Sequence, residues 1–431
     1  MSWKTLYNER LTSAAAAVGR IKSGNRVSLS HAVGEPSHII DAMVANHAAY
    51  RDVEIVHMVP MGKCEYVKPE MAAHFRHNSV FVGAKTRDSV ASGQGDFTPC
   101  YFHQVPHLWS GPLPLDVAIV HVSPPDEHGY CSLGVSVDYS KHAVDAAKTV
   151  IAQVNKFMPR TLGDCFVHVS KLHCIVEHDE PLLELPPPKI TDVERGIGEN
   201  CARLVQDGDC LQLGIGAIPD AVLLFLKEKK DLGIHSEMFS DGVVELVQAG
   251  VINSARKNFH RGQLVATFLM GTKKLYDFVN DNPMVSMHPV SYTNDPAIAG
   301  KNDNLVSINS CIQVDLLGQV CSETVGTTQI SAVGGQVDFV RATAVSRGGR
   351  SIIAMPSIAK KGESKIVSVL EEGAGITTNR YDVDYIVTEH GIAHLKYRTV
   401  RDRARALINI AHPNVQGELK EAFEKRFKTK F

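Results

Sequence analysis

The run Val117–Val122 constrains the fold more than any other segment, because its residues, Val-Ala-Ile-Val-His-Val, are almost all apolar. A strand without polar alternation is typical of a parallel sheet whose two faces are both covered. Strand-like and helix-like segments alternate around this run, which predicts an open α/β layer fold. The expected strands are 26–30, 53–59, 117–122 and 149–154, and the expected helices are 36–49 and 140–147.

This alternation is interrupted at Glu180–Lys189, the most proline-rich stretch of the chain. Proline breaks helices and fits poorly into sheets, so the stretch is a candidate linker. A chain of 431 residues is also too long for one ordinary hydrophobic core. We therefore expect two α/β domains, one over 1–185 and one over 186–431.

The second domain is expected to restart the pattern with a helix near 191–204 and a strand at 210–214. The segments Gly24–Leu29 and Gly208–Leu213 look like equivalent entries into a first strand. They form a weak internal repeat, which is consistent with two similar domains.

Charge and composition exclude several classes of function. The net charge is −2, so no basic field is present that would recruit nucleic acid or anionic lipid. No apolar run approaches the ~20 residues that span a bilayer, and the N-terminus does not resemble a signal peptide. The nine cysteines include no CxxC pair, which argues against a zinc site and favours reduced thiols in the cytoplasm.

One carboxylate, Glu237, follows a glycine turn at Gly214–Gly216 and precedes a second glycine pair, Gly334–Gly335. A glutamate can attack an acyl group as a covalent nucleophile, and backbone N–H groups can hold the oxyanion that forms. Taken singly, these features are weak, because most glutamates are solvated and Gly-x-Gly is commonly a turn. A dinucleotide fingerprint would need glycine where the chain has Pro219. Pro219 instead suits the N1 position at the start of a helix. We therefore expect a helix to follow over 220–229, with its N-terminus toward the site.

Together with other segments along the chain, these residues resemble the family I coenzyme A transferases. The similarity is greatest to the acetyl-CoA hydrolase/transferase branch and, within it, to 4-hydroxybutyrate CoA-transferases. It implies two similar open α/β domains with largely parallel sheets, an active site at the domain interface, and a homo-oligomer, a dimer or higher. The segments that carry it are Ile21–Val27, Ala42–Asn46, Ser123–Tyr130, Gln212–Pro219, His235–Gly242, Ala332–Phe339, Met355–Lys361, Val387–Ala393 and Asp402–Ile408.

The resemblance implies that Glu237 is the nucleophile of a double displacement on acyl-CoA. Coenzyme A would be a substrate, held transiently as a glutamyl thioester, and neither a cofactor nor a metal would be needed. The implied substrates are short-chain acids such as 4-hydroxybutyrate, butyrate or acetate. Three alternatives stay open: an acyl-CoA hydrolase, a non-covalent nucleotide- or sugar-phosphate-binding protein, and an inactive CoA-binding module.

Further site residues follow from the same resemblance. Backbone donors for an oxyanion are expected at Ile215, Gly334 and Gly335, with a strand-like run after this pair at 336–339. Glu389 is the main rival nucleophile, and Glu323 is a weaker one. The residues expected to bind substrate are Gly214, Gly216, Asn294, Gln336, Met355, Lys360, Lys361 and Glu389. Several also have a plain structural interpretation: Asn294 begins an Asn-Asp-Pro turn, Glu389 suits a helix start or a turn, and Lys360 and Lys361 suit a solvated loop.

Overall fold

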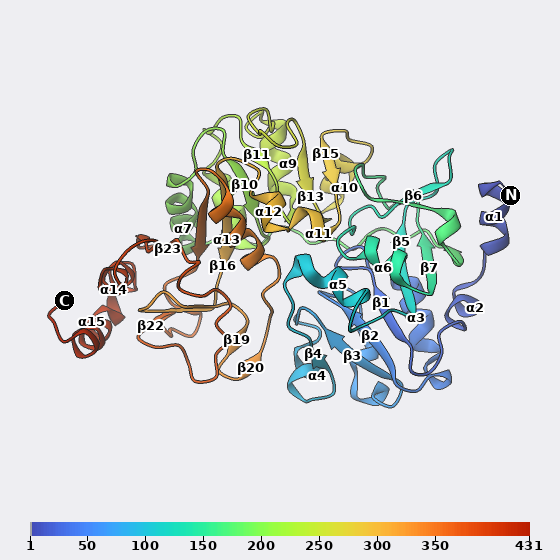
Figure 1. Cartoon of the computed structure of the whole chain (residues 1–431), viewed down its shortest axis with the longest axis horizontal. Coiled ribbons are helices and arrows are strands. Elements are labelled where there is room, and N and C mark those ends of the chain that lie inside the picture. The colour runs from blue at the N-terminus through green and yellow to red at the C-terminus, as the bar shows by residue number, and fades with distance from the viewer. Residues whose placement is uncertain (1) are drawn as a thin grey trace. The chain divides into compact units, whose positions relative to one another are not determined.

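The computed structural model describes residues 2–431. The chain forms two compact units, drawn in Figure 1. The first unit contains the chain up to Pro186 together with Val265–Thr293, and the second contains Pro187–Leu264 and Asn294–Phe431. The chain thus leaves the first unit within the proline-rich stretch. It later contributes a second segment to that unit, which no pattern in the sequence had indicated.

A seven-stranded sheet forms the centre of the first unit. Every neighbouring pair in it is parallel, and all residues of β5 are buried. The predicted α/β class is therefore confirmed, and so is the reason for the apolar run. From edge to edge the strands are β4 (Asp96–Phe97), β3 (Phe75–Ser79), β2 (Val53–His57), β1 (Arg26–Leu29), β5 (Val117–Val122), β7 (Thr149–Val154) and β9 (Cys174–Glu177).

The core of this unit lies between the sheet and the helices that follow the strands. Val27 and Ile55 of the sheet belong to one buried cluster with Ile39 and Met43 of α3. The helix predicted over 36–49 is divided, because α3 ends at Ala45 and a 3-10 turn follows. The helices of the unit are α1 (Trp3–Arg10), α2 (Ala14–Val18), α3 (Ser37–Ala45), α4 (Arg87–Ala91), α5 (Val105–Trp109), α6 (Ser140–Ala146), α10 (Lys273–Val279) and α11 (Val290–Thr293).

Smaller strands of the first unit form short pairs outside this sheet. They are β6 (Tyr130–Ser132) with β8 (Phe166–His168), and β13 (Leu264–Ala266) with β15 (Val285–Met287).

The second unit is built on a mixed sheet whose central strands are parallel. The pairs β10–β16, β16–β21 and β21–β23 are parallel, whereas β12 and β24 join antiparallel at the two sides. In order the strands are β12 (Met238–Phe239), β10 (Cys210–Leu213), β16 (Leu305–Ser310), β21 (Arg350–Ala354), β23 (Tyr385–Thr388) and β24 (Gly391–His394), with β11 (Gly233–Ile234) also paired to β10.

The second unit begins with the predicted helix. Thr191 caps α7 in a capping box with Glu194, which satisfies backbone donors at the helix start. One core cluster joins Ile386 of the sheet to Leu407 and Phe423 of the C-terminal helices. The helices are α7 (Asp192–Arg203), α8 (Ala217–Leu224), α9 (Asp241–Gln248), α12 (Pro296–Ala299), α13 (Gln336–Val345), α14 (Val400–Asn409) and α15 (Pro413–Phe427).

The remaining strands of this unit form two short sheets. They are β17 (Gln313–Asp315) with β18 (Val320–Cys321) and β22 (Ile366–Val367), and β19 (Thr324–Val325) with β20 (Thr328–Gln329).

The two strand entries of the internal repeat have the same backbone conformation. Gly24 and Gly208 precede β1 and β10, with φ of 75° and 84°. Both lie in the left-handed region that favours glycine. The similarity of the two segments thus reflects a shared turn into the first strand of each sheet.

Two local predictions near the site are wrong. Helix α8 covers Ala217–Leu224 rather than 220–229, so Pro219 is its third residue. Proline is tolerated there because the first four N–H groups of a helix have no intrahelical partner. The run 336–339 is not a strand but the start of α13. The run alternates polar and apolar residues, and an alternation over only four residues fits the first turn of a helix as well as a strand.

Within residues 2–431, no helix combines the length and the apolar character needed to cross a membrane.

Candidate active site

The end of β10 and the start of β12 hold Glu237 beside the first glycine turn. Leu213 of β10 pairs with Met238 of β12 in antiparallel register, which puts Gly214 opposite Glu237. The buried hydroxyl of Ser236 accepts a hydrogen bond from the Leu213 N–H at 3.2 Å. Its own proton can go to the carbonyl oxygen of Leu213 at 3.0 Å or of Met238 at 2.6 Å. Ser236 therefore fixes the backbone directly before Glu237.

The glycine turn itself is open. Gly216 has φ of 110°, a conformation that residues with a Cβ rarely adopt, and no atom lies within 4 Å of where its Cβ would be. Ile215 is 38% exposed. This turn is therefore set by backbone conformation, and its first glycine, Gly214, lies opposite Glu237.

Asn294 lies against the carboxylate of Glu237. The Asn294 side chain is fully buried, and its Nδ2 donates to Oε2 of Glu237 at 2.8 Å. The same Nδ2 donates at 3.4 Å to Oδ2 of Asp338. Asn294, predicted to orient a substrate carboxylate, is thus in contact with the predicted nucleophile itself.

Gly335 leaves the room that this contact requires. A Cβ at this position would overlap the carboxylate of Glu237, and it would lie 2.5 Å from Nδ2 of Asn294. Gly335 also caps the N-terminus of α13. Since the first N–H groups of a helix carry partial positive charge, the carboxylate of Glu237 lies where negative charge is favoured. Gly334, the residue before Gly335, has φ of 51°, in the left-handed region that favours glycine.

Buried polar groups support the strand that leads to Glu237. His235 is fully buried, and its Nδ1 accepts from Nδ2 of Asn302 at 3.1 Å. Nζ of Lys257 donates to the carbonyl oxygens of Ile234 at 2.8 Å and Gln263 at 2.9 Å. Burial lowers the pKa of the Lys257 ammonium from its ordinary value. These contacts restrain the backbone that precedes Glu237.

Glu389 makes a separate set of contacts. Its carboxylate accepts from the backbone N–H of Ser357 at 2.9 Å and from the Ser357 hydroxyl at 2.5 Å. It thereby anchors the base of a turn in which Ile358 bridges to Ser364. Lys360 and Lys361 lie exposed in that turn. These contacts join Glu389 to the lysine turn, and none of them joins it to Glu237.

The side chains of three further residues considered in the sequence analysis contact other parts of the protein. Met355 is fully buried in the core next to Cys311, so its side chain has no surface to offer a ligand. Gln336 is buried and donates to Oγ1 of Thr378 at 3.0 Å. Glu323 accepts from Oγ1 of Thr377 at 2.8 Å, which ties it to the neighbouring loop.

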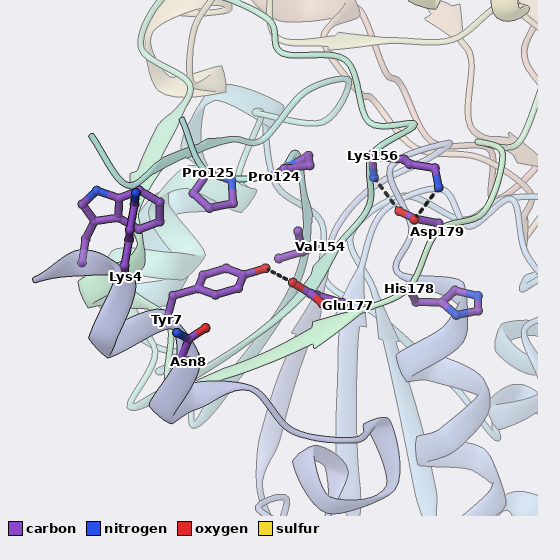
Figure 2. Close-up of a pocket in the computed structure, with 11 residues that line it drawn as sticks. Lys4, Tyr7, Asn8, Pro124, Pro125, Val154, Lys156, Glu177, His178 and Asp179 are labelled. Atoms are coloured by element: carbon purple, nitrogen blue, oxygen red, sulfur yellow. Dashed lines mark hydrogen bonds and ion pairs between the residues drawn. The ribbon is translucent and has the colours of Figure 1, made fainter. Parts of the chain in front are cut away.

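A pocket of about 560 Å³ in the first unit, shown in Figure 2, contains none of these residues. It lies where β5, β7 and β9 end. The hydroxyl of Tyr7 donates to Oε1 of Glu177 at 2.8 Å, and Lys156 pairs with Asp179 at 2.7 Å. Of the polar side chains drawn there, Tyr7 is thus paired with Glu177 and Lys156 with Asp179.

Sequence reasoning assigned no role to Asp338, Ser236 or His235. Asp338 lies in the first turn of α13, where acidic residues are common in any helix. Ser236 and His235 stand directly before Glu237 in the segment that carried the resemblance, and this adjacency is the one signal that could have drawn attention to them.

Comparison with known proteins agrees with this architecture. The N-terminal domain of the acetyl-CoA hydrolase/transferase family matches residues 1–185, and the C-terminal domain of the same family matches residues 271–423. The chain belongs to the acetyl-CoA hydrolase/transferase family.

Individual relatives narrow the class to an enzyme of the CoA-transferase type. The chain is 61% identical over 429 residues to the 4-hydroxybutyrate coenzyme A transferase of Clostridium kluyveri, covering 99% of this chain and 100% of that one. It is 47% identical to the succinyl-CoA:cyclohexane-1-carboxylate CoA transferase of Geobacter metallireducens, covering 98% and 96% of the two chains. The crystal structure of 4-hydroxybutyrate CoA-transferase from Porphyromonas gingivalis aligns with a TM-score of 0.86 at 44% identity, over 99% and 100% of the chains.

Proposed function

We propose that the chain is an acyl-CoA:carboxylate CoA-transferase in which Glu237 is the covalent nucleophile. The observation that carries this proposal is the position of the Glu237 carboxylate, against the Asn294 amide and over a glycine at the N-terminus of α13. A carboxylate so placed has hydrogen-bond donors beside the atoms that would react.

The reaction would proceed in two balanced halves. An oxygen of Glu237 attacks the thioester carbonyl of the donor, and the C–S bond breaks to give a mixed anhydride and CoA thiolate. The thiolate then attacks the glutamyl carbonyl, and the donor acid leaves as its carboxylate. An acceptor carboxylate then undergoes the same steps in reverse and leaves as its CoA thioester. No proton is gained or lost over the cycle, so no general acid is required.

Each attack places negative charge on a carbonyl oxygen. The amide of Asn294 and the N-terminus of α13 are positioned beside Glu237 to stabilise that charge. Loss of one such donor typically costs ~3 kcal/mol of transition-state stabilisation. Ser236 would contribute indirectly, because it holds the Glu237 backbone in register with β10.

We propose short-chain acyl groups as substrates, with 4-hydroxybutyrate first and butyrate and acetate next. The support is the 61% identity to a 4-hydroxybutyrate coenzyme A transferase, compared with 47% to the enzyme that acts on cyclohexane carboxylate. Lys360 and Lys361, exposed on a turn that Glu389 anchors, would meet the phosphates of coenzyme A as point charges.

The test is to trap the glutamyl thioester. The protein is incubated with 4-hydroxybutyryl-CoA without an acceptor and treated with borohydride, which reduces a thioester to an alcohol. We expect donor-dependent inactivation, protection by excess acetate, and a mass change in the peptide containing Glu237. Labelled acetate exchange with 4-hydroxybutyryl-, butyryl- and acetyl-CoA then ranks the acyl groups.

Two variants make the trapping decisive. Glu237→Ala should give no adduct, whereas Glu389→Ala should still be modified at Glu237. An adduct on Glu389 or Glu323 would refute the assignment of the nucleophile, although not the class of enzyme. Discharge of the adduct by water as fast as by acetate would indicate a hydrolase instead.

Two wider expectations stay predictions. The nine cysteines, eight of which are buried, support a reducing compartment, and we propose the cytoplasm. The expected homo-oligomer, a dimer or higher, can be tested by light scattering of the purified protein.

A further inference from the structure

Asn294 has two carboxylates on the same side of its amide. Nδ2 lies 2.8 Å from Oε2 of Glu237 and 3.4 Å from Oδ2 of Asp338. Asn294 is fully buried, Asp338 is 1% exposed, and Oδ1 of Asn294 has no hydrogen-bond partner among the described residues. The whole hydrogen-bonding role of this amide is therefore directed at the two acids.

This geometry fixes which way the amide faces. An Asn side chain has donors on nitrogen and acceptors on oxygen, and a rotation of 180° would turn Oδ1 toward two carboxylate oxygens. Two acceptor oxygens facing one another repel, because both carry negative or partial negative charge, so the two acids favour the observed orientation of the amide. The contact to Asp338 is longer, but its oxygen keeps a second hydrogen-bond acceptor on the donor side of the amide.

The two carboxylates behave differently during the proposed reaction, on which this inference rests. When Glu237 carries an acyl group or coenzyme A, it is neutral and attracts the Asn294 amide less. Asp338 takes no part in the bond changes and keeps its acceptor oxygen toward Nδ2 of Asn294. We propose that Asp338 is a positioning residue, which keeps the Asn294 donor aimed at the glutamyl carbonyl while Glu237 is covalently modified.

The chemical consequence concerns the discharge of the thioester. An acceptor carboxylate attacks the glutamyl carbonyl carbon, and the resulting oxyanion needs a donor before the C–S bond breaks to release CoA thiolate. Without Asp338 the buried amide can rotate, so that its oxygen instead of its N–H faces that charge. Attack on the modified Glu237 would then slow, whereas binding of the CoA substrate would not change.

Asp338→Ala tests this directly. We expect turnover to fall about tenfold, with the KM for acyl-CoA unchanged and with the full amount of enzyme still able to form the borohydride-sensitive thioester. Discharge of that preformed thioester by acetate should slow about tenfold. Asp338→Asn should retain more activity than Asp338→Ala, because its amide oxygen can still accept from Asn294.

A double-mutant cycle separates positioning from a structural role. If Asp338 acts through Asn294, Asp338→Ala should cost less than about twofold when Asn294 is already alanine. The matched control is Thr343→Ala, which removes a buried hydroxyl of the same helix that donates to the Val340 carbonyl at 2.7 Å. This control should lower the melting temperature and leave turnover unchanged.

The outcomes are distinguishable. Normal discharge in Asp338→Ala, additive losses in the cycle, or equal losses in Asp338→Asn and Asp338→Ala would each overturn the inference while the wild type is still trapped at Glu237. Failure to trap the wild type at Glu237 would instead remove the proposed function on which it rests.

Discussion

Replacement of Gly335 by alanine should disable the site without unfolding it. The backbone at this position has φ of −92° and ψ of 4°, which alanine can adopt, so the change introduces no backbone strain. The added Cβ would lie 2.5 Å from Nδ2 of Asn294 and 2.9 Å from Cδ of Glu237. The perturbation is therefore one methyl group placed against two side chains of the candidate site.

The magnitude follows from these separations. Real Cβ atoms essentially never approach a heavy atom closer than 3.0 Å, and ordinary contact begins at 3.4 Å. The amide must therefore retreat by about 0.5–1 Å, and the Glu237 oxygen that the Cβ would overlap must move by more than about 1 Å. Since a misplacement of ~1 Å of a reacting group can cost ~100-fold, we expect turnover of Gly335→Ala to fall about 100-fold.

The assay is acetate exchange from 4-hydroxybutyryl-CoA, with a melting curve for each variant. Gly417→Ala is the matched control, because no atom lies within 4 Å of its Cβ position in α15. It should keep normal turnover and become slightly more stable, since alanine is favoured over glycine in a helix by up to ~1 kcal/mol. Turnover of Gly335→Ala above about a third of wild type, or collapse of its fold, would refute the reasoning.

Three further predictions concern the nucleophile, its support and the first unit. Glu237→Asp should lose about 100-fold in turnover, because the shorter side chain withdraws the attacking oxygen by ~1 Å; a well-folded variant with near-normal rates would contradict this. Ser236→Ala should lower both turnover and the free energy of unfolding, the latter by ~1–3 kcal/mol, because the Leu213 N–H loses its partner; an unchanged denaturation midpoint would argue against the role of the hydroxyl. Burial lowers the pKa of His57 and of His121 from 6.5 to about 4. Below pH 6.5 these histidines are therefore protonated in the unfolded chain but still neutral in the folded chain. The free energy of unfolding should fall between pH 6.5 and 4 by roughly 3 kcal/mol for each histidine. Melting temperatures across this range, compared with His121→Gln, test the slope, and a flat profile would count against it.

The amino-acid sequence by itself determined the α/β class. The apolar run of β5 can be satisfied only where both faces of a strand are covered, and this requirement is local to the run. The turns at Gly24 and Gly208 were predictable for the same reason, because the left-handed conformation acts on one residue at a time.

Other local features could not be settled from the sequence. The segment 336–339 looked like a strand, yet it begins α13, because an alternation of only four residues fits either element. The return of Val265–Thr293 to the first unit also left no pattern in the sequence, because contacts with distant segments, and not local propensity, determine with which unit it packs.

In the candidate site too, some features could be proposed from the sequence and others only from the structure. Glu237 and Gly335 could be proposed from their neighbours in the sequence and from the family resemblance, although their roles stay predictions. The contacts among Glu237, Asn294 and Asp338 could not be predicted from the sequence. Asn294 is 57 positions from Glu237 and 44 positions from Asp338. Only the packing of α13 and of the turn at Asn294 against the start of β12 brings one amide within reach of two carboxylates. That packing depends on the fit of side chains across the whole unit, which no local pattern encodes.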